Sequence, residues 1–243
     1  MFRRIVMTAL AAGVLAGIFG WGLQMVTTTP LIMAAEMYEP GGGEAAMSDA
    51  HTHDSAAEET DGHEHDHGDG MWMPEGGMER HAYTLLTSIL MGVGFGFVLT
   101  GVFALCGRGV GLNEGVLWGL GGFAAIYLAP ALGLPPELPG MMASDLDARQ
   151  MWWIFAVAGS SVGLALIVFS PNPLWKLAGA LITVIPHIVG APQPEMVDLA
   201  EMAGSVPAEM AARFAVTSLV TVGLFWVVLG ALAGYFYDRF SEA

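Results

Sequence analysis

The chain has 243 residues, of which 54% are hydrophobic and only 13% are charged. Soluble domains carry about 25% charged residues, so this composition favours a membrane protein. The formal net charge of -15, with only eight Lys and Arg residues, disfavours nucleic acid as a partner because phosphate binding needs basic side chains. The single Cys106 excludes an intrachain disulfide and a cysteine-based metal cluster.

Six uncharged stretches are long enough to cross a bilayer, which takes about 20 apolar residues as a helix. They run from Ile5 to Val26, Ala82 to Gly107 and Gly115 to Pro136, and then between Arg149 and Lys176, between Lys176 and Glu195, and between Arg213 and Asp238. Pro171 and Pro173 separate the fourth stretch from the fifth, because proline cannot continue a helix interior. We therefore expect an all-α integral membrane protein, a polytopic bundle of about six transmembrane helices.

The first stretch shares some features with a secretory signal, since Arg3 and Arg4 precede it and Ala34-Ala35 offers small residues. The apolar region of a signal is about 7 to 15 residues long, whereas no charge occurs here between Arg4 and Glu36. We therefore expect the first helix to be retained in the mature protein. If it were cleaved, five transmembrane helices would remain.

The basic residues predict the orientation, because positive charge is retained on the cytoplasmic side. A cytoplasmic N-terminus places five of the eight inside, namely Arg3, Arg4, Arg108, Lys176 and Arg239. It also places 20 of the 23 acidic residues outside. We expect a multi-pass protein of the inner (plasma) membrane with both termini in the cytoplasm. Its organisation would be a first transmembrane helix (1–35), an acidic, His-rich non-cytoplasmic loop (36–80) and a five-helix membrane core (81–243).

Five of the expected helices carry glycine pairs at four-residue spacing, which lets helix backbones approach closely in lipid. The pairs are Gly13 and Gly17, Gly92 and Gly96, Gly115 and Gly119, Gly159 and Gly163, and Gly230 and Gly234. We interpret them mainly as packing within one bundle, with an oligomer interface as the alternative.

The expected loop is rich in Gly, Ala, Glu, Asp and His, so it should be mostly disordered without a ligand. It holds five of the seven histidines: His51, His53, His63, His65 and His67. Imidazoles alternating with carboxylates are typical of transition-metal binding, although this composition selects no particular metal. The alternative is a solvated acidic segment with incidental histidines.

His187 is the one titratable group well inside an apolar stretch, and it follows Pro186, where we expect helix five to break. An ionisable residue in a membrane segment indicates function by default. The alternative is an imidazole satisfied by a neighbouring helix.

Acidic and amide side chains flank helices three to five on the same side as the His-rich loop. They are Glu137, Asp145, Asp147, Gln150, Gln193 and Glu195. A path for a dication could begin there, with oxygen ligands replacing water step by step; a solvated rim is the alternative. Because the only lysine, Lys176, is followed by Leu177, the chain lacks a P-loop, and we find no catalytic constellation. We therefore expect neither an enzyme nor a cofactor.

Two proline-rich motifs, residues 128–140 and 186–194, together with Asp145-Leu146, Arg149-Gln150 and Trp152-Trp153, resemble the predicted cobalt transporter subunit family CbtA. The resemblance implies uptake of Co2+ for cobalamin synthesis, alongside a small single-helix, histidine-containing CbtB-like subunit. On the family pattern, a translocation path would use Glu137, Asp145, Arg149, Gln150, His187 and Gln193.

Our leading hypothesis is a nucleotide-independent permease subunit for a divalent metal, most simply Co2+, with the His-rich loop capturing metal outside. The alternatives are a membrane-anchored metal-binding or sensing protein, and a transporter of Ni, Zn or Cu.

Overall fold

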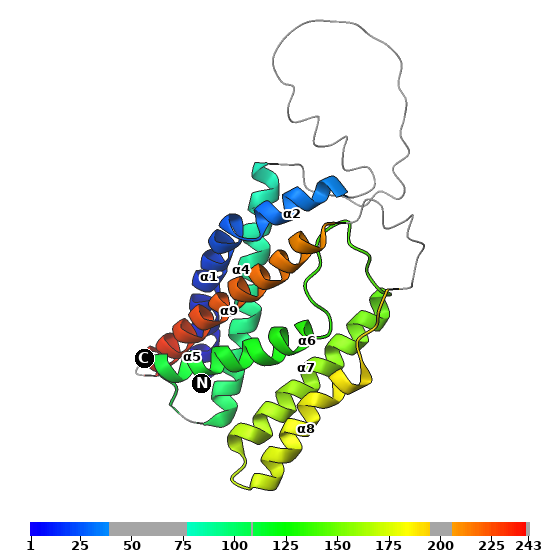
Figure 1. Ribbon diagram of the computed structural model, residues 1–243. Helices are drawn as coiled ribbons and strands as arrows, with labels where there is room; N and C mark the ends of the chain where they lie inside the picture. The colour runs from blue at the N-terminus through cyan, green and yellow to red at the C-terminus, as the bar shows by residue number, and fades with distance from the viewer. Residues whose placement is uncertain (39–76, 108, 195–205, 242–243) are drawn as a thin grey trace, which may run out of the picture.

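The computed structural model describes residues 1–38, 77–107, 109–194 and 206–241, and the regular elements within these ranges are all helices (Figure 1). They are α1 (Phe2–Val26), α2 (Thr29–Ala35), η1 (Glu36–Tyr38), α4 (Met78–Cys106), α5 (Leu112–Phe123), η2 (Ala124–Leu128), α6 (Ala129–Ala131), α7 (Leu146–Phe169), α8 (Pro173–Val189) and α9 (Ala208–Arg239). The expectation of an all-α protein is confirmed for this part of the chain.

Four of the described helices are long and apolar enough to cross a membrane: α1, α4, α7 and α9. The third expected span falls on α5, η2 and α6, which follow one another without a break from Leu112 to Ala131. The fifth falls on α8, a shorter apolar helix of 17 residues. The structure therefore supports a helical membrane protein, and the number of six spans stays a prediction.

Glycine holds α1 and α4 together, because no side chain separates their backbones. A Cβ added at Gly92 would collide with the carbonyl oxygen of Gly13, and one added at Gly17 would lie 2.6 Å from the Cα of Ile89. Further along, a Cβ at Gly96 would lie 2.8 Å from the carbonyl oxygen of Ala9. Such close approach is the main source of helix association in lipid, where no hydrophobic drive acts between helices.

Backbone contact at glycines also joins two more helix pairs. On α5, Gly115 and Gly119 face Gly230 and Gly234 of α9, and a Cβ added at Gly115 would collide with the Gly230 carbonyl oxygen. On α7, Gly159 and Gly163 face α8, where the nearest atoms belong to Ile182, Pro186, Gly179 and Thr183. All five predicted glycine pairs thus pack within the chain, which confirms the interpretation as internal packing.

The α1–α4 and α5–α9 pairs form the main body, while α7 and α8 form a hairpin beside it that contacts the body through η2 and α6 (Figure 1). At one end of the body, which we call the terminal end, the first turn of α1 meets the last turns of α9. The guanidinium of Arg4 lies 3.6 Å from the Tyr237 ring centroid, and its Nε donates to the Tyr237 carbonyl oxygen at 2.6 Å. Both described chain ends therefore lie on the same side.

At the opposite end, which we call the loop end, an apolar cluster of Ala35, Leu138, Val206 and Phe214 joins α2, the segment after α6 and the start of α9. η1 and the first turn of α4 also lie there, bound to each other through Glu36 and Arg80. Within the segment expected as a loop from 36 to 80, the structure places η1 at one end and the start of α4 at the other, and the division into domains stays a prediction. The interior of this segment, residues 39–76, lies outside the described residues.

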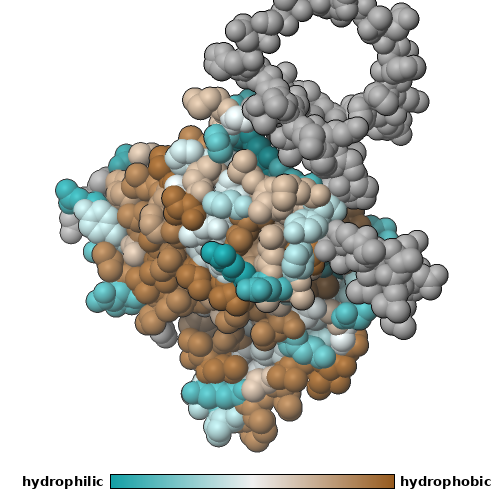
Figure 2. Space-filling model, turned by 45° about the horizontal axis from the view of Figure 1, so that its top comes forward, coloured by the Kyte–Doolittle hydropathy of each residue, from teal (hydrophilic) through white to brown (hydrophobic). Residues whose placement is uncertain are grey.

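Large apolar side chains remain exposed along the helices, as a lipid-facing surface requires and a water-facing one disfavours. On α4 alone, the exposed fraction is 62% for Leu90 and 88% for Leu105. Figure 2 shows hydrophobic side chains over broad areas of the face in view, with hydrophilic side chains in smaller patches.

The α1–α4 contact allows a matched test of glycine packing. Gly92→Ala should lower the free energy of unfolding in detergent by about 1 to 3 kcal/mol, the usual cost of overpacking, because the added methyl group meets the backbone of α1. Gly94→Ala is the control, since nothing lies within 4 Å of a Cβ there. Equal thermal shifts for the two variants would contradict this role of Gly92.

Candidate functional site

Three of the six predicted path residues lie together in a cavity at the loop end. Glu137, Arg149 and Gln150 line it, together with the segment from Pro130 to Pro136 and the first turns of α7, around a volume of about 540 Å³. We call it the rim cavity. Arg149 Nη2 donates to Glu137 Oε2 at 2.6 Å, and both side chains are partly buried, with exposed fractions of 28% and 22%. The pairing leaves the local net charge near zero.

Asp145 and Gln193 have local backbone roles instead. Asp145 caps the N-terminus of α7, where its side chain accepts a hydrogen bond from the Ala148 amide at 2.9 Å. The exposed side chain of Gln193 donates from Nε2 to the carbonyl oxygen of Ala191 at 3.3 Å. Neither residue lines the rim cavity.

The predicted break at Pro186 is wrong, because α8 continues through Pro186 to Val189. Two contacts accommodate the proline close to the end of the helix. Gly159 of α7 leaves room for the proline ring, and Trp152 Nε1 donates to the Pro186 carbonyl oxygen at 3.2 Å. His187 lies in the last turn, where its ring meets the edge of Trp152 with centroids 5.8 Å apart. This contact favours a packed imidazole on α8.

A second cavity, of about 710 Å³, lies between α1, α4, η2 and α9, with Trp153 of α7 on its wall. We call it the central cavity. Its polar lining residues are Gln24, Arg80, Tyr83, Thr84, Thr87, Ser88, Tyr127 and Thr221. Tyr127 and Trp153 line both cavities, so these two aromatic side chains stand between them.

The polar groups of α4 follow its helical period. Arg80, Thr84, Thr87 and Ser88 are spaced so that they share one face of the helix, and Met91 and Phe95 continue the same face deeper in. This spacing could have revealed the cavity wall from the sequence, since an arginine at i and hydroxyls at i+4, i+7 and i+8 interrupt an otherwise apolar helix. The length and lack of charge of the stretch from Ala82 to Gly107 predict a membrane span and do not distinguish this face.

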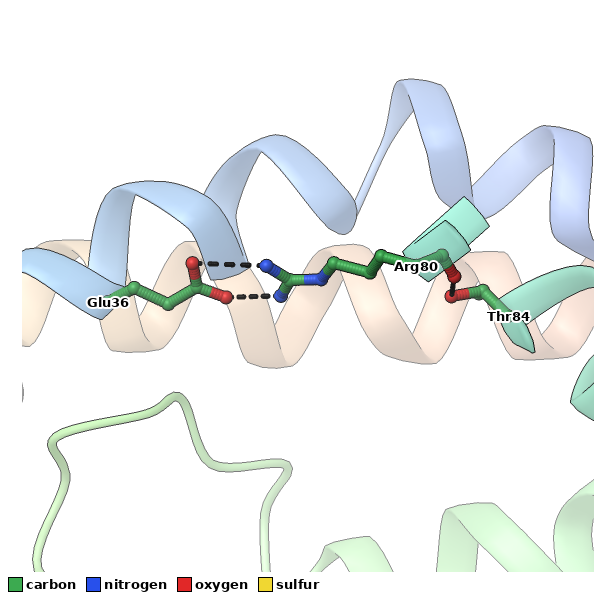
Figure 3. Close-up of polar contacts among 3 residues, drawn as sticks. All are labelled: Glu36, Arg80 and Thr84. Atoms are coloured by element: carbon green, nitrogen blue, oxygen red, sulfur yellow. Dashed lines mark hydrogen bonds and ion pairs between the residues drawn. The ribbon is translucent and has the colours of Figure 1, made fainter. Parts of the chain in front are cut away.

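Arg80 at the mouth of the central cavity is held by Glu36 in a two-pronged ion pair (Figure 3). Arg80 Nη1 donates to Glu36 Oε2 at 3.2 Å, and Nη2 pairs with Oε1. The backbone carbonyl of Arg80 also accepts a hydrogen bond from Thr84 Oγ1 at 2.8 Å. Such forked geometry fixes the guanidinium in place as well as balancing its charge.

Toward the terminal end, aromatic packing closes the central cavity. The rings of Phe95 and Trp226 line its floor, with centroids 4.8 Å apart. Below them lies a buried apolar cluster that includes Leu99, Phe103 and Leu229. The structure therefore has a polar-lined space in the half near the loop end and a close-packed apolar core in the other half.

Within the described ranges, no three His, Cys, Asp or Glu side chains come together as a metal site. The five histidines of the predicted capture loop, His51, His53, His63, His65 and His67, lie outside the described residues. The two cavities therefore offer a cation neutral oxygens beside two arginines, each paired with a glutamate.

The ion pair of the rim cavity makes a testable contribution to stability. Glu137→Gln should lower the free energy of unfolding by about 1 kcal/mol, because it leaves the partly buried Arg149 without its counter-charge. Asp147→Asn removes an exposed carboxylate at the same end of α7 and should cost less. Thermal unfolding in detergent measures the stability of both variants. A loss of stability for Asp147→Asn that equals or exceeds that for Glu137→Gln would contradict the stabilising role of the ion pair.

One sequence comparison identifies the family of this chain. A family model described as "Probable cobalt transporter subunit (CbtA)" matches residues 2–238. The comparisons with curated proteins and with solved structures gave no match. Since the matched region spans nearly the whole chain and all the helices described above, the protein belongs to the CbtA family of probable cobalt transporter subunits.

Proposed function

We propose that this chain is the permease subunit of a divalent transition-metal uptake system of the inner membrane, and that its substrate is Co2+ destined for cobalamin synthesis. The observation that carries the proposal is the family match over residues 2–238. The structure adds a physical argument, because polar-lined cavities inside an apolar helix bundle are costly in lipid unless they serve a solute.

The loop end would face outward in this proposal. It carries the exposed carboxylates of Asp145 and Asp147 beside Glu36 and Glu137, which are each paired with an arginine, whereas Arg4 lies at the terminal end with both described chain ends. An acidic face attracts dications and raises their local concentration. The His-rich loop, with His51, His53, His63, His65 and His67, would capture metal there and raise its concentration at the loop end. A small, single-helix, CbtB-like subunit would complete the transporter.

The sensor hypothesis remains the alternative from another class. It takes support from the ring contact of His187 with Trp152, which leaves that imidazole packed against α7. In that case the His-rich loop would be the active part and no metal would cross. The two hypotheses differ in whether metal accumulates behind the bilayer.

Metal uptake is the direct test. Proteoliposomes that contain the chain with its small partner should accumulate Co2+, and Zn2+, Ni2+ and Cu2+ added in equal amounts should compete poorly. Liposomes without protein give the background. The Glu137→Ala, His187→Ala double variant should lower uptake by at least about tenfold, the order expected when a coordinating position is lost.

Two results would count against this proposal. Binding without accumulation would favour the sensor, and full accumulation by the double variant would remove Glu137 and His187 from the path.

Deleting residues 51–67 separates capture from conduction. A capture arm raises local metal concentration, so the deletion should slow uptake at low Co2+ and leave the rate unchanged at saturating Co2+. Initial rates over a concentration series give the KM and the maximal rate separately. A collapse of the maximal rate itself would show that this segment is part of the conducting machinery.

A further inference from the structure

We propose that the central cavity is a compartment that a hydrated dication enters at the loop end, past the Glu36–Arg80 pair, and that Glu36 admits cations to it by neutralising Arg80. This inference rests on the proposed function, because it takes metal transport by this chain as given. It assigns a role to residues outside the predicted path, all of them on the α1–α4–α9 body.

The size and lining of the cavity suit a hydrated ion. A shell of six waters occupies roughly 200 Å³ at about 30 Å³ for each water, well within the volume of about 710 Å³. Hydroxyls of Thr87, Ser88 and Thr221 and the amide of Gln24 line the walls. Neutral oxygens can hydrogen-bond the water shell without binding the ion tightly, and weak binding lets an ion leave again.

The charge at the mouth decides which ions enter. Arg80 is the one charged side chain among the described residues that line the central cavity. Alone it would repel a dication strongly in this low-dielectric setting. Glu36 pairs with both of its terminal nitrogens, from η1, so the mouth carries no net charge while the pair holds.

The location of the pair links this charge control to the chain's organisation. Glu36 precedes the His-rich segment and Arg80 follows it, so the two ends of that segment meet at the mouth of the cavity. Metal released at the base of the loop would therefore arrive beside the central cavity. The Phe95–Trp226 contact at the floor would have to open before the ion could continue toward the terminal end.

A double-mutant cycle on the Glu36–Arg80 pair, measured in proteoliposomes, tests the inference. Glu36→Gln should lower the initial Co2+ uptake rate by about tenfold, because it leaves the positive charge of Arg80 unpaired. Arg80→Gln, which leaves an unpaired carboxylate, should raise the rate. The double variant should return it to within about twofold of the parent. Glu209→Gln removes an exposed carboxylate at the loop end away from the cavity and serves as the charge control.

The signs of these changes distinguish the inference from its rivals. If the ion pair only clamps η1 to α4, all three variants should lose activity together, which would overturn the proposal. If the cavity does not carry the cation, the single variants should not change the Co2+ uptake rate in opposite directions, which would also overturn it.

Labelling gives a second measurement that does not depend on flux. In a Cys106→Ser background, Ser88→Cys should react with a membrane-impermeant, positively charged thiol reagent added from outside, and Co2+ should slow the reaction. Val98→Cys, an exposed position of α4 beyond the cavity, should stay unreactive. An inert Ser88→Cys in protein that still transports Co2+ would refute the cavity assignment and leave the proposed function standing. Absent uptake by the parent would refute the proposed function instead.

Discussion

The fold depends on backbone contact between helices in lipid, where apolar side chains gain nothing by leaving one hydrocarbon surface for another. Glycine makes that contact in each of three helix pairs, α1 with α4, α5 with α9 and α7 with α8. Gly13 and Gly92 bring α1 and α4 into backbone contact, and the polar face of α4 lines a space that it shares with residues of α1, η2 and α9. The central cavity is the space that this arrangement leaves open near the loop end.

The interior of the bundle is polar near the loop end and apolar toward the terminal end, which fits passage of an ion from one end to the other. Near the loop end, side-chain oxygens and paired charges line the cavities, whereas Phe95, Trp226 and the cluster beneath them exclude water toward the terminal end. Both arginines that line the cavities are paired with a glutamate, Arg149 with Glu137 and Arg80 with Glu36. Paired charges cost less to hold at the edge of a membrane than single ones. They also leave each entrance close to neutral, so that small changes at either glutamate would alter its preference for cations.

The sequence alone predicted the helical class, the short α7–α8 turn and the glycine contacts, because each follows from local spacing of charges, prolines or glycines. It also brought together Glu137, Arg149 and Gln150, although Asp145 and Gln193 turned out to serve nearby backbone groups. It failed at Pro186, where Gly159 and Trp152, more than 25 residues away in the chain, allow the helix to continue. It also missed Glu36 and Arg80, since an ion pair between residues 44 positions apart depends on where the fold places η1 and the start of α4. Local pattern determines the helices, and long-range packing determines the site.

Metal uptake through the loop end requires that lipid surrounds the bundle and that the loop end faces away from the cytoplasm. Epitope tags at the two chain ends and, separately, a tag inserted between residues 51 and 67 measure this directly in intact cells. We predict that an antibody added outside reaches the inserted tag, and that it reaches the two end tags only after the membrane is permeabilised. End tags that are accessible on intact cells would reverse the orientation and remove the basis for metal uptake through the loop end.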